Sequence, residues 1–129
     1  MNAKPFLILP LLAGLLLSSS PILAHHSAAE FDMTKIVPVK GTVTQFEWYN
    51  PHPYIFLEVK NDKGDVEKWS GELAALPMMS RAGWKRDTVK PGDQVTMYGN
   101  PAKDGRFLMR LDKILLPNGQ ELLAARAAN

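Results

Sequence analysis

The 129-residue sequence contains no cysteine. It therefore has no thiol nucleophile, no disulfide framework and no cysteine for lipid attachment. A domain of this size must then be stabilised by its hydrophobic core without disulfides. The sequence also lacks a phosphate-cradling glycine loop and the G-x-S-x-G elbow of serine hydrolases. These absences leave few groups from which an active site could be built, and we predict that the protein is not an enzyme.

The charge balance is close to even, and neither sign is concentrated in one segment. Fifteen lysines and arginines face thirteen aspartates and glutamates, for a net charge of +2. A nucleic-acid-binding surface needs a stripe of basic residues, and the sequence has no such stripe. We therefore expect no nucleic-acid partner.

No apolar run in the sequence is long enough to span a bilayer. The longest covers residues 6–17, short of the roughly 20 residues required, and Pro10 interrupts it. Lys4 precedes this run, and small polar residues and Ala24 follow it. A positive start, a short apolar stretch and a small-residue end are typical of a secretory signal peptide.

We predict that residues 1–24 form a signal peptide that is cleaved during export to the periplasm. The mature chain then begins at His25 and has no stable membrane insertion. A cut after Ala29 is the alternative, because Ser27 and Ala29 fit the small-residue preference of the cleavage site.

Apolar and polar residues alternate from Val37 onward, which predicts a β-strand. The apolar positions change parity between Val43 and Phe46. One extra residue in the strand would produce this change, so we expect a β-bulge near Thr44-Gln45 in a long, bent first strand.

The remaining sequence predicts four more strands, a short final strand and one helix. The strands are expected over residues 54–59, 66–72, 94–99 and 107–116, with a last one after Asn118-Gly119, and the helix over residues 73–82. Three strands, a helix and two further strands is the order of an OB-fold. We predict an all-β, five- to six-stranded OB-like barrel over residues 37–124, preceded by an arm (25–36) and followed by a frayed tail (125–129). An SH3-like barrel or a small sandwich is the alternative.

Several short motifs occur in an order that resembles a known family. They are His25-His26-Ser27, Phe31-Asp32, Gly41-Thr42-Val43, Glu47-Trp48, Asn50-Pro51-His52, Arg81-Ala82-Gly83-Trp84 and Lys90-Pro91-Gly92-Asp93. Together they resemble a family of small exported bacterial proteins known only as a domain of unknown function. The resemblance implies export and a small β-barrel, but it implies no activity.

The three histidines suggest a metal site. Cleavage after Ala24 would give His25 a free α-amine beside its ring, and His52 lies in a rigid Asn-Pro-His-Pro turn. An amine and two imidazoles in a planar set suit Cu(II), and the amine loses its proton easily because its pKa is about 7.7–8.0. We hypothesise a copper site at His25, His26 and His52. Zinc would need a fourth ligand such as Glu30, Asp32 or water.

The methionines are expected to be structural. Met97 and Met109 fall at inward strand positions, and Met78-Met79 lies beside Pro77 on the helix, so we expect all four to pack into the barrel. Trp84 is likewise expected to pack at the end of the helix.

Four aromatic residues around the His52 turn suggest a different function. Tyr54 and Phe56 lie on the strand face opposite Ile55 and Leu57, and Trp48 and Tyr49 precede the turn. Aromatics in this part of an OB-fold often form a stacking surface. Glu47 and Glu72 are a possible carboxylate pair on neighbouring strands, although strand glutamates are more often simply exposed.

Two main hypotheses follow from the sequence. The first is a periplasmic protein that carries, buffers or senses Cu(II). The second is a non-catalytic OB-like module that binds an envelope ligand or protein through Trp48, Tyr49, Tyr54 and Phe56. A structural role in a membrane complex is a third possibility.

Overall fold

The computed structural model describes residues 28–124, which form six strands, one α-helix and one 3-10 turn. The observed order of strands and helix is the predicted one. Within these residues no helix is long and apolar enough to cross a bilayer. The elements are η1 (Ala28–Glu30), β1 (Val37–Glu47), β2 (Tyr54–Lys60), β3 (Val66–Glu72), α1 (Leu76–Arg81), β4 (Gln94–Pro101), β5 (Leu108–Leu115) and β6 (Glu121–Leu123).

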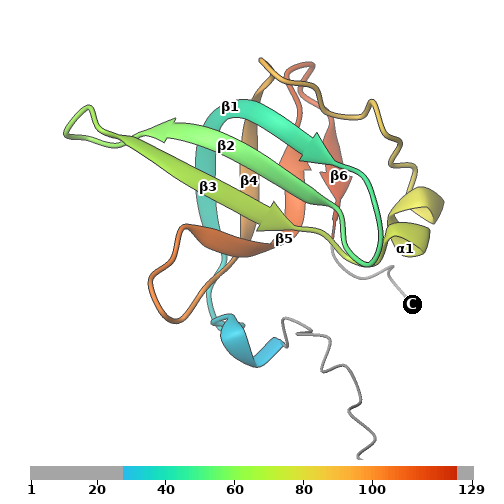
Figure 1. Ribbon diagram of the computed structural model, residues 1–129, viewed down its shortest axis with the longest axis horizontal. Coiled ribbons are helices and arrows are strands. Elements are labelled where there is room, and N and C mark those ends of the chain that lie inside the picture. Colours follow the sequence, from blue (N-terminus) through green and yellow to red (C-terminus); the bar gives the residue numbers. More distant parts are fainter. Residues whose placement is uncertain (1–27, 125–129) are drawn as a thin grey trace, which may run out of the picture.

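The strands form one closed barrel with an extra strand outside it. Their order is β3-β2-β1-β4-β5-β6, and a parallel pairing of β3 with β5 closes the ring of the first five (Figure 1). All other pairings are antiparallel. The topology confirms the predicted all-β, OB-like barrel.

β1 is long because it takes part in two sides of the barrel. Its first half pairs with β4 from Val37 to Thr42, and its second half pairs with β2 from Thr42 to Glu47. The β1–β2 register shifts between Val43 and Gln45. The predicted bulge is therefore confirmed, and the bend that it introduces lets one strand serve both neighbours.

Inward side chains from β1, β2, β4 and β5 fill the interior, and Trp69 of β3 packs against them. The most deeply buried are Val43, Ile55, Leu57, Met97, Met109, Leu111 and Ile114. Met97 and Met109 have no exposed surface, and Met79 of α1 is buried with them, so the structural assignment of these methionines is confirmed. Burying apolar surface at about 25 cal/mol per Å² makes this cluster the main source of stability.

The helix α1 covers one end of the barrel but is shorter than predicted. Pro77 stands in its first turn, where the missing N–H costs nothing, and Gly83 with φ +93° ends it. The next residue, Trp84, is buried, and its Nε1–H donates to the Leu123 carbonyl at 2.7 Å. The predicted packing role of Trp84 is confirmed.

The segment before β1 is attached to the barrel by specific contacts. Phe31 is 1% exposed and packs with Ala102 and Leu108, which form a small second core. The Asp32 N–H donates to the Pro101 carbonyl at 2.9 Å. Asn100, itself buried, donates to the Lys35 carbonyl at 2.6 Å. The described part of the predicted arm therefore contains a 3-10 turn and one buried residue, Phe31, which anchors the segment to the barrel.

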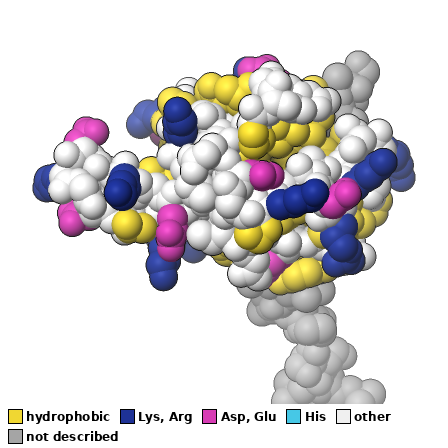
Figure 2. Space-filling view, turned by 90° about the horizontal axis from the view of Figure 1, so that it is seen from above, with side chains coloured by type: hydrophobic (Ala, Val, Ile, Leu, Met, Phe, Trp, Pro, Cys, Tyr) yellow, Lys and Arg dark blue, Asp and Glu magenta, His cyan; other side chains and the backbone are white. Residues whose placement is uncertain are grey.

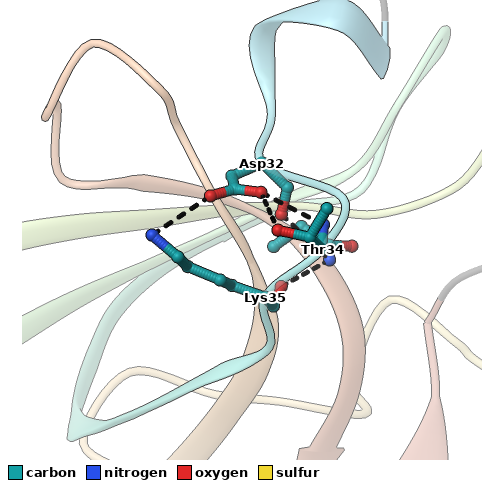
Figure 3. Close-up of polar contacts among 4 residues, drawn as sticks. Asp32, Thr34 and Lys35 are labelled. Carbon is teal, nitrogen blue, oxygen red and sulfur yellow. Dashed lines mark hydrogen bonds and ion pairs between the residues drawn. The ribbon is translucent and has the colours of Figure 1, made fainter.

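A side-chain cap shapes the chain just after this anchor. One oxygen of Asp32 accepts from the Thr34 N–H at 3.1 Å and from the Thr34 hydroxyl at 2.6 Å, and the other lies 3.2 Å from Lys35 Nζ (Figure 3). The Thr34 hydroxyl, the Thr34 backbone N–H and the Lys35 ammonium lower the pKa of Asp32. The cap turns the chain from the anchor into β1.

Candidate functional site

His52 lies in the β1–β2 turn between Pro51 and Pro53. Both prolines accept backbone hydrogen bonds from the segment after β3, which hold the turn in place. The Asn50-Pro51 peptide bond is cis. The Leu73 N–H donates to the Pro53 carbonyl at 3.0 Å, which fastens the turn to the segment after β3. His52 Nδ1 lies 2.9 Å from the Leu73 carbonyl oxygen. A carbonyl can only accept, so Nδ1 carries a proton, and in the neutral ring Nε2 has the free lone pair.

The His52 ring is only partly buried, and its Nε2 has no hydrogen-bond partner within residues 28–124. Within the same residues no three His, Asp or Glu side chains are placed to hold a metal ion. His25 and His26, the other two predicted ligands, lie outside the described residues. The predicted metal site can therefore be examined at His52 alone.

The described N-terminal segment shares a small core with the start of β2. Phe31 packs with a cluster against which Tyr54 also lies, and Tyr54 follows His52 by two residues. Five residues lie between His25 and Phe31, and the last three of them form the 3-10 turn η1. The segment that follows His25 is therefore attached to the strand that follows His52.

Three of the four predicted aromatic residues reach one face of the sheet. Tyr54 and Phe56 point outward from β2, with ring centroids 6.2 Å apart and planes 26° apart. Tyr49, 55% exposed, lies on the same face because its hydroxyl donates to Glu47 at 2.5 Å. Trp48 instead packs against the core, with its ring 5.7 Å from that of Phe46. The aromatic surface therefore consists of Tyr49, Tyr54 and Phe56.

Two glutamates flank Tyr54 on this outer face. Register pairs Glu47 with Tyr54 and Tyr54 with Glu72, so the three residues form one row across β1, β2 and β3. The Tyr54 hydroxyl donates to Glu72 Oε2 at 2.7 Å. The sequence placed the two carboxylates on neighbouring strands, and the structure corrects this, because β2 and its tyrosine lie between them.

Burial and nearby negative charge raise the pKa values of the tyrosines on this face. Burial raises the pKa of Tyr54 strongly, and the hydrogen bond to Glu72 and the nearby Glu30 and Glu47 raise it further. The Glu47 hydrogen bond raises the pKa of Tyr49. Both phenols are therefore hydrogen-bond donors at neutral pH. Glu72 is only 5% exposed, which sequence reasoning missed, because its burial depends on the β3–β5 pairing that closes the barrel beside it.

A hollow of about 440 Å³ adjoins this row, over the β1 bulge. Phe56 forms part of its lining, between its register partners Gln45 and Ser70. Because Ser70 is small, space remains beside the ring. The other side chains that border the hollow are Thr44, Glu58 and Lys68, with Leu57 and Trp69 beneath.

Charges of both signs are mixed on the face of the molecule that Figure 2 shows. Figure 2 shows basic and acidic side chains side by side on the face seen from above, with hydrophobic side chains between them. At the hollow, Glu58 and Lys68 are register partners on neighbouring strands, so opposite charges stand next to each other. The neighbouring row is acidic.

Comparison with known proteins gives a family and a distant structural likeness. A search of curated proteins gave no match. The fold is similar to that of the mitochondrial single-stranded DNA binding protein Rim1 from S. cerevisiae (crystal form 2), with a TM-score of 0.49 and 12% identity. That match covers 64% of this chain and 93% of the Rim1 chain. The model of a family of unknown function, DUF6152, matches residues 13–109, so the chain belongs to this family.

Proposed function

We propose that this protein is exported to the periplasm and binds a metal ion, most plausibly Cu(II), which it carries, buffers or senses. The observation that supports the proposal best is the hydrogen bond between His52 Nδ1 and the Leu73 carbonyl. Histidines that ligate metals usually donate their second ring N–H to a carbonyl or carboxylate, which fixes the ring and its tautomer. His52 has this arrangement, with Nε2 available for a metal.

The other ligands come from the start of the processed chain. Cleavage after Ala24 makes His25 the first residue, so that its amine and ring nitrogen bind one ion together. His52 Nε2 supplies the third nitrogen, and His26 assists. Nitrogen donors suit Cu(II), which also has the highest affinity in the divalent series. The packing of Phe31 in one cluster with Tyr54 supports this proposal, because it attaches the segment after His26 to the strand after His52.

The test is a Cu(II) titration of the signal-processed protein, with intact mass to establish the first residue and EPR to report the ligands. We expect one tight, nitrogen-rich equivalent. The informative variant is His52→Asn, because asparagine Nδ2 replaces the donor Nδ1 while no group replaces Nε2. We expect it to keep the wild-type melting temperature and to lose the tight site.

Two further samples complete the experiment. One glycine added before His25 displaces the amine and should weaken Cu(II) binding, whereas a residue added after Asn129 should not. A processed chain that begins at Glu30, or equal Cu(II) affinity in wild type and His52→Asn, would refute the proposal. Tighter binding of zinc than of Cu(II) under the same conditions would mean that the site exists but that its metal is zinc.

A second candidate function rests on a separate observation, the exposed aromatic face of Tyr49, Tyr54 and Phe56. In this proposal the protein is a module that binds an envelope ligand or protein. Tyr49→Ala removes the most exposed ring without touching the core and should abolish binding, and the matched control is Val66→Ala, which is 53% exposed on the distant hairpin. Binding that Tyr49→Ala and Phe56→Leu both leave unchanged would exclude this function.

A further inference from the structure

We propose that the hollow over the β1 bulge binds a sugar ring of a neutral glycan, with Phe56 as the stacking surface. The inference rests on the second proposed function, the aromatic face, and does not depend on metal binding. It names the class of ligand for that face.

The size and lining of the hollow fit one sugar unit. Its volume of about 440 Å³ lies in the range of small-molecule sites, about 300–1,000 Å³. A pyranose has an apolar C–H face and a rim of hydroxyl groups. The partly exposed Phe56 ring offers a surface for the C–H face. The gap above it exists because Ser70, the register partner on β3, is small.

The polar groups around the ring suit hydroxyl groups, which both donate and accept. Ser70 contributes a hydroxyl, and the Thr44 hydroxyl, which donates to the Phe56 carbonyl at 3.3 Å, can accept. The Gln45 amide donates one N–H to Glu47 at 2.8 Å and keeps a second N–H and its oxygen for a ligand. Glu58 accepts and Lys68 donates from the two sides of one cross-strand pair. A rim of mixed donors and acceptors matches a sugar better than it matches an apolar ligand.

The charge distribution decides between a neutral glycan and a polyanion. Glu58 and Lys68 offset each other at the hollow, and the adjacent row carries Glu47 and Glu72. A single-stranded nucleic acid needs a positively charged groove along its backbone. The neighbouring acidic row would repel a nucleic acid or any other phosphate-bearing polymer. The charge distribution therefore favours an uncharged polyol.

The test is an NMR titration of the ¹⁵N-labelled protein with three neutral trisaccharides, chitotriose, cellotriose and maltotriose, at millimolar concentration. The chitotriose is the neutral N,N′,N″-triacetyl form. We expect at least one of the three to shift the amides around Thr44, Phe56 and Ser70. Ser70→Gln fills the hollow from an outward position and should abolish the shifts. Phe56→Leu keeps the apolar bulk but loses the ring, and should weaken binding by about threefold to tenfold.

Ser80→Gln is the matched control, because it makes the same change at an exposed position on α1 and should bind like the wild type. Three results would overturn the inference: no shift with any trisaccharide, shifts that persist unchanged in Ser70→Gln, or an oligo-dT that shifts the same amides. A protein partner whose binding requires Tyr49 but is unaffected by Ser70→Gln would overturn the proposal of glycan binding. The second proposed function, an aromatic interaction surface, would then stand.

Discussion

The hydrogen bond between Tyr54 and Glu72 is expected to contribute measurably to stability. Tyr54→Phe removes the hydroxyl that donates at 2.7 Å to a carboxylate with 5% exposure. Hydrogen bonds to charged groups are worth about 1.5–3 kcal/mol, and because Tyr54 is partly exposed we expect about 2 kcal/mol. For a domain of this size such a loss lowers the melting temperature by about 10 °C.

The raised pKa of Tyr54 gives this prediction a pH dependence on the alkaline side. The folded state raises the pKa of Tyr54, so the stabilisation is complete below the unfolded pKa near 10 and is lost as the pH rises above it. Wild-type stability should therefore fall above pH 10 more steeply than that of Tyr54→Phe.

A double-mutant cycle in urea separates this bond from the packing of the ring. The cycle uses Tyr54→Phe, Glu72→Met and the double variant at pH 7. We expect a coupling of at least about 1 kcal/mol, because each single change already removes the hydrogen bond. Purely additive losses, or identical stability of Tyr54→Phe and wild type, would refute the reasoning.

Three further predictions test other parts of the fold. Gly99→Ala should cost about 1–3 kcal/mol in urea unfolding, because its Cβ would lie 2.3 Å from a backbone carbonyl of β5; Gly71→Ala should cost less, because a flexible methionine tip is its nearest neighbour. The lowered pKa of Asp32 means that its cap contributes above about pH 4 and is lost below it, so protection of the Thr34 amide from hydrogen exchange should fall there, but not in Asp32→Asn. Trp84→Phe leaves the Leu123 carbonyl without its donor and should lower stability by about 1 kcal/mol, measured by thermal unfolding; no change would contradict this role.

Local patterns in the sequence were sufficient to predict the barrel. Strand alternation and turn residues gave each strand, and the parity change after Val43 located the bulge because side chains in a strand alternate strictly between faces. The same parity places Trp48 on the inner side with Phe46, although we had assigned it to the aromatic surface. The helix was predicted too long because Pro77 can begin a helix as well as interrupt one.

The features that the sequence did not reveal all depend on contacts between distant segments. Asn100 holds the carbonyls of the segment before β1, and Glu72 is buried because β5 closes the barrel beside it. The hollow over Phe56 depends on the register that places Ser70 opposite it. No local pattern encodes these pairings. The tautomer of His52 likewise follows from a carbonyl on another segment.

The parallel β3–β5 pairing has a consequence for how the protein folds. It joins strands that lie on either side of α1 and β4 in the chain, and β1–β4 is also a long-range pairing. The β1–β2, β2–β3, β4–β5 and β5–β6 pairings join consecutive strands and can form locally, whereas β1–β4 and β3–β5 each close a long loop. The chain must therefore lose the entropy of closing these two loops before the ring is complete. Folding should be slow for a small domain, in the millisecond-to-second range, with β3 and β5 exposing unpaired strand edges until they meet. During that interval the chain is open to aggregation, and a chaperone that holds extended strands would protect it.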